Sequence, residues 1–248
     1  MSLALAAGTL GYSADPVCSD LLVRKMHGVV SAGQFNDFRG IGEYQLVLGE
    51  TFTAHLARLV RGNRWLDVGA GHARAQKEYL LGKRGFFDWI FKGRADVVAV
   101  AAKVAKPTRY SKMVDTAVEG SRKFLGLFGR YVEDIPDQEL GRADVITDVF
   151  GAISYSERVD AVLNKYLRVL NAGGSIYIHT SPEHTKIIRK DGTQVTLVQW
   201  LDSVDGLAVK VEAMSIVVTP TRVGVVVPTL KLVGGKADVP PERVFQEV

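Results

Sequence analysis

The sequence predicts an α/β protein in which helices cover both faces of a mostly parallel sheet and an antiparallel hairpin over residues 207–233 closes it. Two observations predict this fold class. Between residues 64 and 179 short apolar runs alternate with helical patterns, the order that gives parallel strands with right-handed crossovers. Beyond residue 206 two strand-like runs follow each other with only a turn between them. A chain of 248 residues that is 47% hydrophobic can bury one substantial core.

The first predicted elements are a helix, a strand and a second helix. Apolar residues at steps of four, four and three give residues 45–60 the stripe of an amphipathic helix: Leu48, Phe52, Leu56 and Leu59. Residues 64–68 predict a short strand that leads into a glycine turn. Residues 73–81 predict a helix whose last apolar residues are buried: Tyr79, Leu80 and Leu81.

The middle of the chain predicts three further strands. Residues 96–101 are a continuous run of small and β-branched residues, which is typical of a strand covered on both faces. A helix over 111–127 and a strand over 129–133 are expected before the chain breaks at Pro136. Residues 144–150 predict another buried strand.

The clearest helical pattern follows this strand. Ser154 and Glu157 have the spacing of a capping box, which predicts a helix start, and an apolar face extends to Leu170. The sequence Asn-Ala-Gly-Gly over 171–174 predicts a left-handed stop, and residues 175–179 predict the next strand.

The predicted terminal hairpin joins strands over 207–218 and 223–233 through a turn at 219–222. Pro228 cannot donate a hydrogen bond within a central ladder. We therefore expect a bulge there or a shorter strand.

Composition limits the classes of protein to which the chain can belong. Cys18 is the only cysteine, so no intrachain disulfide can form, which fits a reducing, cytoplasmic location. No stretch reaches the ~20 apolar residues needed to cross a bilayer. The formal charge of +4 permits an anionic partner without requiring one. No group of His, Cys and Asp residues has the spacing of metal ligands, so no metal is expected.

The motif that carries chemistry is Asp67-Val-Gly69-Ala-Gly71, between a predicted strand and a predicted helix. Glycines let the backbone turn tightly and approach a ligand closely. The amides at a helix N-terminus can bind a carboxylate or phosphate. Ligands of open α/β sheets bind beyond the carboxyl ends of the strands, so this turn predicts a nucleotide-like ligand.

In this motif the chain resembles the class I S-adenosylmethionine-dependent methyltransferases. Their first motif is an acidic residue, any residue, Gly, any residue, Gly, any residue, then Gly or a small residue, and here it reads Asp67-Val-Gly-Ala-Gly-His-Ala73. Residues 167–178 resemble their leucine-rich helix, glycine turn and fifth strand, and residues 131–136 resemble the segment after their third strand. The resemblance implies a Rossmann-like sheet of seven strands in a domain over 61–248, preceded by a helical lid over 1–60.

The resemblance also implies S-adenosylmethionine as the cofactor. The position at the end of the second strand, where the family usually has an acid that holds the ribose hydroxyls, is Ala101. The residues expected to contact the cofactor lie in the first loop, at the ends of the second and fourth strands, and in the segment expected to meet adenine: Asp67, Gly69, Ala70, Gly71, Ala101, Glu133, Asp134, Ile135, Asp148 and Val149.

Methyl transfer from a sulfonium is an in-line displacement, for which the protein mainly supplies alignment. A hydroxyl acceptor also needs a base, and His179 and His184 lie at the end of the fifth strand with a suitable pKa range. The expected acceptor contacts are Tyr44, Phe150 and Tyr155. The Asn/Asp-Pro-Pro-aromatic motif of enzymes that methylate base amines is absent after the fourth strand, so we predict a small-molecule acceptor.

Two alternatives stay open. An NADP-dependent oxidoreductase would use Lys103 and Lys106 for the 2′-phosphate, although Arg74 stands where a dinucleotide loop needs a small residue. A non-catalytic protein of the same fold would bind a partner through the aromatic and basic segment 82–94. That segment could contact a nucleic acid or a membrane, but packing of its aromatic residues on the sheet is favoured. The oligomeric state is left open.

Overall fold

The computed structural model describes residues 39–82, 93–101, 123–236 and 242–248. Several positions considered above lie outside these ranges: Cys18, Lys103, Lys106 and nearly all of segment 82–94. In the described part no helix is both long and apolar enough to cross a membrane.

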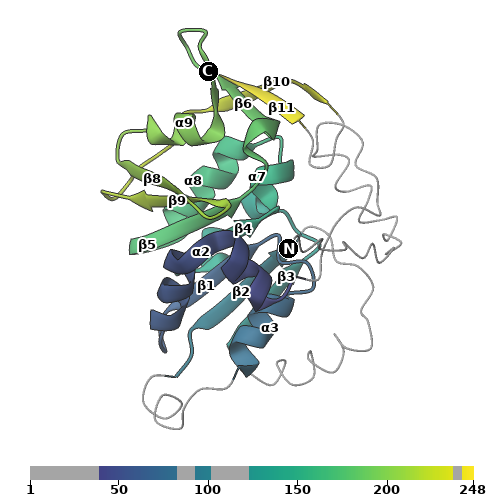
Figure 1. The fold of residues 1–248 in the computed structure, drawn as a ribbon, viewed down its shortest axis with the longest axis vertical. Helices are drawn as coiled ribbons and strands as arrows, with labels where there is room; N and C mark the ends of the chain where they lie inside the picture. Colours follow the sequence, from purple (N-terminus) through teal and green to yellow (C-terminus); the bar gives the residue numbers. More distant parts are fainter. Residues whose placement is uncertain (1–38, 83–92, 102–122, 237–241) are drawn as a thin grey trace, which may run out of the picture.

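Seven strands form the main sheet in the order β3-β2-β1-β4-β5-β9-β8 (Figure 1). The first five along the chain are parallel, β9 is antiparallel to β5, and β8 is antiparallel to β9. Their bounds are Arg64–Val68 (β1), Asp96–Ala101 (β2), Phe124–Phe128 (β3), Ala143–Val149 (β4), Leu170–His179 (β5), Leu207–Glu212 (β8) and Ser215–Pro220 (β9). This order confirms the predicted fold class, a doubly wound, Rossmann-like sheet closed by an antiparallel hairpin.

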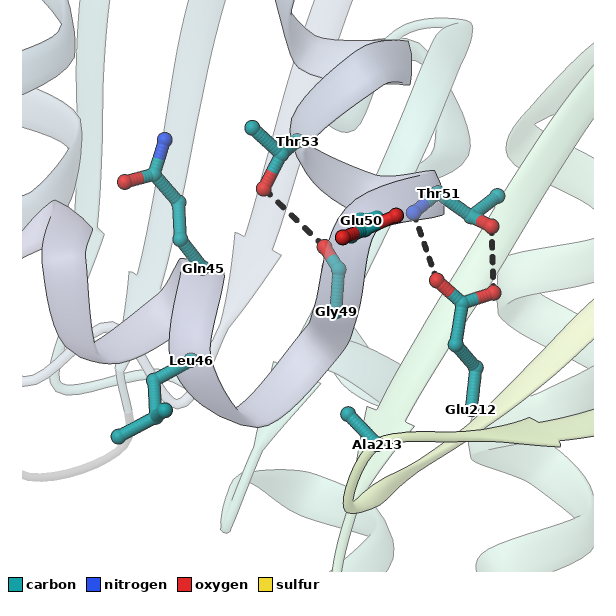
Figure 2. A pocket seen from close by; sticks show the side chains of 8 residues that line it. All are labelled: Gln45, Leu46, Gly49, Glu50, Thr51, Thr53, Glu212 and Ala213. Carbon is teal, nitrogen blue, oxygen red and sulfur yellow. Dashed lines mark hydrogen bonds between the residues drawn. The ribbon is translucent and has the colours of Figure 1, made fainter.

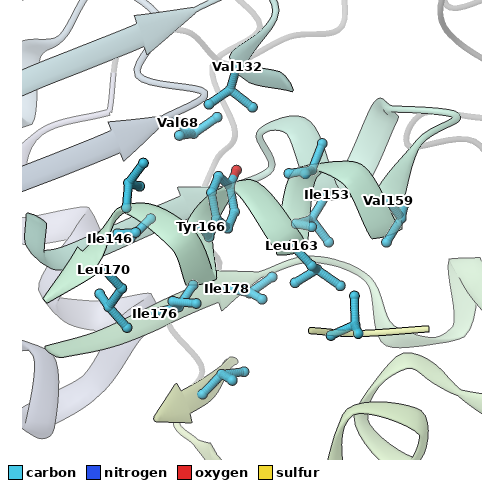
Figure 3. Packing of buried hydrophobic residues seen from close by; sticks show 14 of the residues in the cluster. Val68, Val132, Ile146, Ile153, Val159, Leu163, Tyr166, Leu170, Ile176 and Ile178 are labelled. Carbon is cyan, nitrogen blue, oxygen red and sulfur yellow. The ribbon is translucent and has the colours of Figure 1, made fainter. Parts of the chain in front are cut away.

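Helices cover both faces of the main sheet because successive strand residues point to opposite sides. Trp65 packs toward α2 and α3, whereas its neighbour Leu66 packs toward α8. Figure 3 shows Leu163 and Tyr166 of α8 facing the isoleucines of β4 and β5. The helices are α2 (Ile41–Arg58), α3 (Arg74–Leu81), α6 (Asp137–Leu140), α7 (Ala152–Tyr155), α8 (Val159–Val169) and α9 (Leu197–Asp202), with 3-10 turns η1 (Val132–Asp134) and η2 (Pro182–His184).

Aromatic rings fill the space between α2 and the sheet. The Tyr44, Phe52 and Trp65 rings lie 6.0 to 6.5 Å apart between centroids, and Phe52 also meets Tyr177 at 5.4 Å. The part of the predicted lid that the structure describes is therefore packed into the core. A truncation meant to test a lid should stop at residue 38 rather than 45, since Tyr44 is only 1% exposed. The domain boundary at residue 60 stays a prediction.

A second sheet, absent from the prediction, lies against the α8 side of the molecule (Figure 1). Its order is β10-β11-β6-β7, with bounds Leu230–Lys236 (β10), Glu242–Glu247 (β11), Thr185–Ile188 (β6) and Gln194–Thr196 (β7). Ile187 and Phe245 from this sheet are both fully buried with Trp200 of α9 in the core beneath α8. The second sheet therefore extends the main core.

The predicted terminal hairpin was wrong in its turn and its second strand. The turn lies at Ala213 and Met214, where Ala213 takes a left-handed φ of 51°. Residues 223–229, which include Pro228, form no strand. In this segment the Val227 amide donates to the Asn164 side chain at 2.8 Å, and the Asn164 side chain donates to the Val227 carbonyl at 3.3 Å. The side-chain amide of Asn164 in α8 therefore takes the place of a neighbouring strand.

Other predicted boundaries also differ. The third strand lies at Phe124–Phe128 rather than 129–133, because Gly129 turns the chain at φ 74° and its amide bonds the Ala101 carbonyl. Residues 124–127 are therefore not helical, and 111–122 lie outside the described residues. Leu81 is 50% exposed, at the end of α3.

The predicted start and stop of the clearest helix were wrong as well. α8 begins at Val159 after Arg158, and Ser154 instead donates to the Thr180 hydroxyl from within α7. α8 ends at Val169, where Leu170 is already extended and starts β5. Gly173 does adopt a left-handed φ of 77°, but within β5.

Candidate functional site

The glycine loop follows β1, which lies between β2 and β4 in the sheet. Connections on the two sides of β1 run in opposite directions, so the loop occupies a topological switch point, where open α/β sheets bind ligands. Left-handed φ values occur at Gly69 (87°), Gly71 (52°) and Ala73 (55°). The amides of Gly69 and Ala70 both bond the Val100 carbonyl, at 2.9 and 3.1 Å, which fixes the loop over β2.

The loops after β1 and β4 touch through their backbones. A Cβ atom built on Gly69 would lie 2.4 Å from Cα of Gly151, and one built on Gly151 would lie 2.2 Å from the Val68 carbonyl oxygen. Only glycine fits this contact at either position. Gly69 was predicted as a ligand contact, and the structure shows that its lack of a side chain also lets the second loop approach.

Asp67 lies beneath the glycine loop with no exposed surface. One carboxylate oxygen accepts hydrogen bonds from the Tyr44 hydroxyl at 2.8 Å and the Gln76 amide at 2.6 Å. The other accepts from Thr147, whose hydroxyl in turn accepts from the Trp65 indole at 2.8 Å. This network ties α2, α3, β1 and β4 together at the loop. Burial raises the pKa of Asp67 to about 7, against the hydrogen bonds from Thr147 and Tyr44.

The raised pKa of Asp67 predicts a loss of stability with rising pH. The folded state holds the Asp67 proton up to about pH 7, whereas the unfolded state releases it near 3.8. Between these values the native chain binds more protons, so the free energy of unfolding falls as pH rises. Asp67→Asn should remove the contribution of Asp67 to this slope, so that the difference in unfolding free energy between variant and wild type changes by on the order of 4 kcal/mol across the window. Urea unfolding at several pH values checks this.

Asp205→Asn is the control for this titration, because the Asp205 side chain is 93% exposed. Its unfolding curve should stay parallel to that of wild type across the same range. Parallel curves for Asp67→Asn and wild type would show that Asp67 does not carry a proton in the folded state at neutral pH.

Asp148 holds the loop after β4 from below. Its carboxylate accepts from the amides of Gly151 at 2.9 Å and Ile153 at 3.0 Å and from the Tyr166 hydroxyl at 2.6 Å. Burial raises its pKa to about 6, and these hydrogen bonds oppose the shift. Asp148 is fully buried, so the structure places this predicted cofactor contact under the loop as an anchor of α7.

Arg243 of β11 holds the other end of α7. Its guanidinium donates to the carbonyls of Ser156 and Ile153, both at 2.6 Å, and to the Thr185 hydroxyl at 2.8 Å. The side chain is fully buried, and burial lowers its pKa to about 10. A carboxylate at the start of a helical turn and a cation at its end both match the helix dipole. Arg243 stands in a segment with no motif and is not among the predicted site residues.

Two residues predicted on the acceptor side, Phe150 and His179, meet at the ends of β4 and β5, next to the predicted cofactor contact Val149. Phe150 has a left-handed φ of 47°, and its amide bonds the His179 carbonyl at 2.8 Å. The Phe150 and His179 rings meet edge to face at 4.6 Å between centroids. The Val149 carbonyl accepts from Arg39 at 3.3 Å. Left-handed φ in a bulky residue is strained and is typical of functional sites.

His179 has the hydrogen-bonding pattern of a neutral base. Its Nδ1 lies at hydrogen-bond distance from the Met214 carbonyl, which can only accept, so Nδ1 carries the proton and Nε2 keeps its lone pair. Burial lowers the pKa of His179, against the effect of that hydrogen bond. His184 lies beyond Thr180 in η2, where the chain passes into the second sheet.

The other predicted acceptor contacts are placed differently. Tyr44 is buried, and its hydroxyl is engaged by Asp67 rather than facing a ligand. Tyr155 ends α7 and is half-buried, and burial raises its pKa to about 12. The structure thus brings together Phe150, His179 and the end of β4, while Tyr44 belongs to the Asp67 network.

The segment predicted to meet adenine forms η1 and the residue after it. One oxygen of Glu133 accepts from the Ser156 hydroxyl at 3.1 Å, while the other, Oε2, is buried with no hydrogen-bond partner in the described structure. Asp134 is exposed and pairs with Arg158 at 3.5 Å, and Ile135 is fully buried. Ala101 ends β2 and contributes no polar side chain.

A separate open hollow of about 610 Å³ lies beside α2. There α2 is kinked at Gly49, which has a φ of 88°. Figure 2 shows Glu212 reaching to the start of the second half of α2, where it accepts from the Thr51 amide at 2.6 Å. Hydrogen bonds from Lys210 and Thr51 lower the pKa of Glu212 to about 2. None of the predicted site residues lines this hollow, which is shaped by a helix kink and its cap.

The described residues include no group of three or more His, Cys, Asp or Glu side chains that could hold a metal ion. No family model matches the sequence. No curated protein sequence matches it either.

Several solved structures are similar to this one. An rRNA methylase from Streptococcus thermophilus is 12% identical with a TM-score of 0.42, over 68% of this chain and 92% of that one. PigF with SAH is 14% identical with a TM-score of 0.40, over 70% of this chain and 62% of that one. PKMT2 from Rickettsia typhi is 15% identical with a TM-score of 0.33, and the match spans 47% of this chain but only 20% of that longer one.

Proposed function

We propose that this chain is an S-adenosylmethionine-dependent methyltransferase that acts on a small-molecule acceptor. The observation that carries the proposal is the glycine loop at the switch point of the sheet, with left-handed φ at Gly69 and Gly71. A loop of this shape lets a nucleotide-like ligand approach the backbone closely. A cytoplasmic location is part of the proposal.

The residues around the loop fit this cofactor. The first turn of α3 has no side-chain cap, so its amides suit the carboxylate of the methionine end. Oε2 of Glu133, which has no partner among the described residues, suits the amine of adenine. Ala101 supplies no carboxylate for the ribose hydroxyls, so in this proposal affinity comes from the glycine loop and Glu133.

When bound, S-adenosylmethionine supplies a methyl group that is already activated by its sulfonium charge. The protein then has to align the acceptor and accept a proton. His179 Nε2 can take the proton of an acceptor hydroxyl, because the Met214 carbonyl holds the imidazole in the required tautomer. The lowered pKa keeps His179 neutral before the reaction. Phe150 fixes the position of the imidazole through ring contact.

Titration calorimetry tests the cofactor assignment. We expect wild-type protein to bind S-adenosylmethionine and S-adenosylhomocysteine with micromolar affinity and not to bind NADPH. Gly71→Arg should abolish both interactions, because Gly71 is buried in the loop with a left-handed φ of 52°, where a large charged side chain is strained and would enter the proposed binding site. Gly42→Arg is the matched control, since no atom lies within 4 Å of a Cβ built on Gly42.

The outcomes separate the remaining functions. Binding of NADPH alone would replace the proposal with a pyridine-nucleotide oxidoreductase. If none of the three ligands binds, a non-catalytic protein of this fold is favoured. The presence of Ala101 where the family usually has an acid supports that alternative. Retained binding in Gly71→Arg would move the cofactor away from the glycine loop.

A further inference from the structure

Arg39 lies at the acceptor side of the candidate site and forms no ion pair with any of the described residues. Its guanidinium donates to the Val149 carbonyl at 3.3 Å, and its Cζ lies 5.6 Å from the centroid of the Phe150 ring. A guanidinium has five N–H donors in a fork that matches a carboxylate. Most of this donor capacity is therefore available to an anionic ligand.

The carboxylates beneath this site do not hydrogen-bond Arg39, although the Arg39 charge contributes to lowering the pKa of Asp67. Asp67 and Asp148 are both fully buried, and their oxygens already accept hydrogen bonds from other groups. Arg39 lies close enough to contribute to lowering the pKa of His179, although burial has the larger effect. It also opposes the burial that raises the pKa of Tyr155 to about 12. Arg39 is therefore a cation without an ion-pair partner among the described residues, beside the Phe150 ring.

The Phe150 ring connects this cation with the proposed base. His179 lies 4.6 Å from the ring centroid and Arg39 lies 5.6 Å from the same centroid. A flat acceptor packed on this aromatic surface could bring an anionic group to Arg39 and a hydroxyl to His179 at once. Aromatic surfaces favour stacked or edge-to-face ring partners.

We propose that the acceptor is a small aromatic hydroxy acid whose carboxylate binds Arg39 and whose hydroxyl faces His179. This inference rests on the proposed function. In the reaction the hydroxyl oxygen forms a bond to the methyl carbon while the bond from that carbon to sulfur breaks. The hydroxyl proton moves to His179 Nε2 and then to water. The products are the methyl ether, S-adenosylhomocysteine and one proton, so atoms and charge balance.

The probes are the three hydroxybenzoate isomers and the three corresponding hydroxybenzamides. Calorimetry on protein saturated with S-adenosylhomocysteine should show at least one acid binding about tenfold more tightly than its amide, because a charged bidentate contact is lost in the amide. The same acid should yield its methyl ether when S-adenosylmethionine is supplied, as detected by mass spectrometry.

Variants assign this preference to Arg39. Arg39→Gln should remove the difference between acid and amide, and Arg39→Lys should keep part of it. Both should bind S-adenosylhomocysteine within about twofold of wild type, which also shows that they fold. Arg58→Gln is the control, an exposed arginine at the other end of α2.

The result separates the two proposals. If wild-type protein does not bind S-adenosylhomocysteine, the proposed function fails. If it does bind, but no acid is preferred over its amide or Arg39→Gln keeps the preference, only the hydroxy acid inference is overturned.

Discussion

Gly151→Ala is expected to bind S-adenosylhomocysteine about tenfold more weakly, because a displaced loop loses on the order of 1.4 kcal/mol of contact with the ligand. The added Cβ would lie 2.2 Å from the Val68 carbonyl oxygen and 2.9 Å from Oδ1 of Asp148. The backbone oxygen cannot rotate away, so one of the two loops must move. Overpacking of this kind also costs about 3 kcal/mol of unfolding free energy. Calorimetry and urea unfolding measure the two effects separately.

Gly42→Ala is the matched control for this substitution. Gly42 lies exposed in α2, and a Cβ added there would have no atom within 4 Å. The same methyl group should therefore raise helix stability slightly and leave affinity unchanged. Wild-type affinity in Gly151→Ala would show that contact between the two loops is not needed for binding.

Arg243→Met is expected to lower the free energy of unfolding by about 3 kcal/mol. Methionine fills a similar volume but leaves the carbonyls of Ile153 and Ser156 and the Thr185 hydroxyl without their donor. Loss of the buried charge offsets part of this cost, because the cation no longer has to be desolvated. The free energy of unfolding of Arg243→Lys should lie between those of Arg243→Met and wild type, since one ammonium group cannot make all the hydrogen bonds of the planar guanidinium.

Arg222→Met serves as the comparison for this loss. Arg222 forms an exposed ion pair with Asp205 at 2.7 Å, and its removal should cost less than about 1 kcal/mol. Equal effects of the two substitutions in chemical denaturation would mean that Arg243 does not anchor α7.

The alternation of parallel strands and helices along the chain was predictable because it depends on local patterns. Residues 96–101 and 144–149 are short runs rich in β-branched residues, which is typical of covered strands, and Gly69 and Gly71 mark the turn between β1 and α3. The terminal region was not predictable in this way. Residues 223–229 have the composition of a strand, but Asn164 satisfies the backbone of Val227, and β10 pairs with β11 instead.

In the candidate site, too, features that depend on local patterns were predictable and features that depend on distant partners were not. Asp67 and Asp148 were predicted to contact the cofactor, but the hydrogen bonds that bury them depend on partners far away in the chain. Thr147 is 80 residues from Asp67, and Ile153 is 90 residues from Arg243. A sequence pattern does not encode such pairings. Arg39 carries no local signal either, and its place beside Phe150 and Val149 emerges only when the chain is folded.

The contact between the loops at Gly69 and Gly151 has a thermodynamic consequence. One loop belongs to the proposed cofactor side and the other, through Phe150, to the proposed acceptor side, and their backbones are in close contact. A ligand that orders one loop therefore reduces the entropy that a second ligand must lose at the other. Because such coupling is reciprocal, the acceptor should tighten cofactor binding by the same factor by which the cofactor tightens acceptor binding.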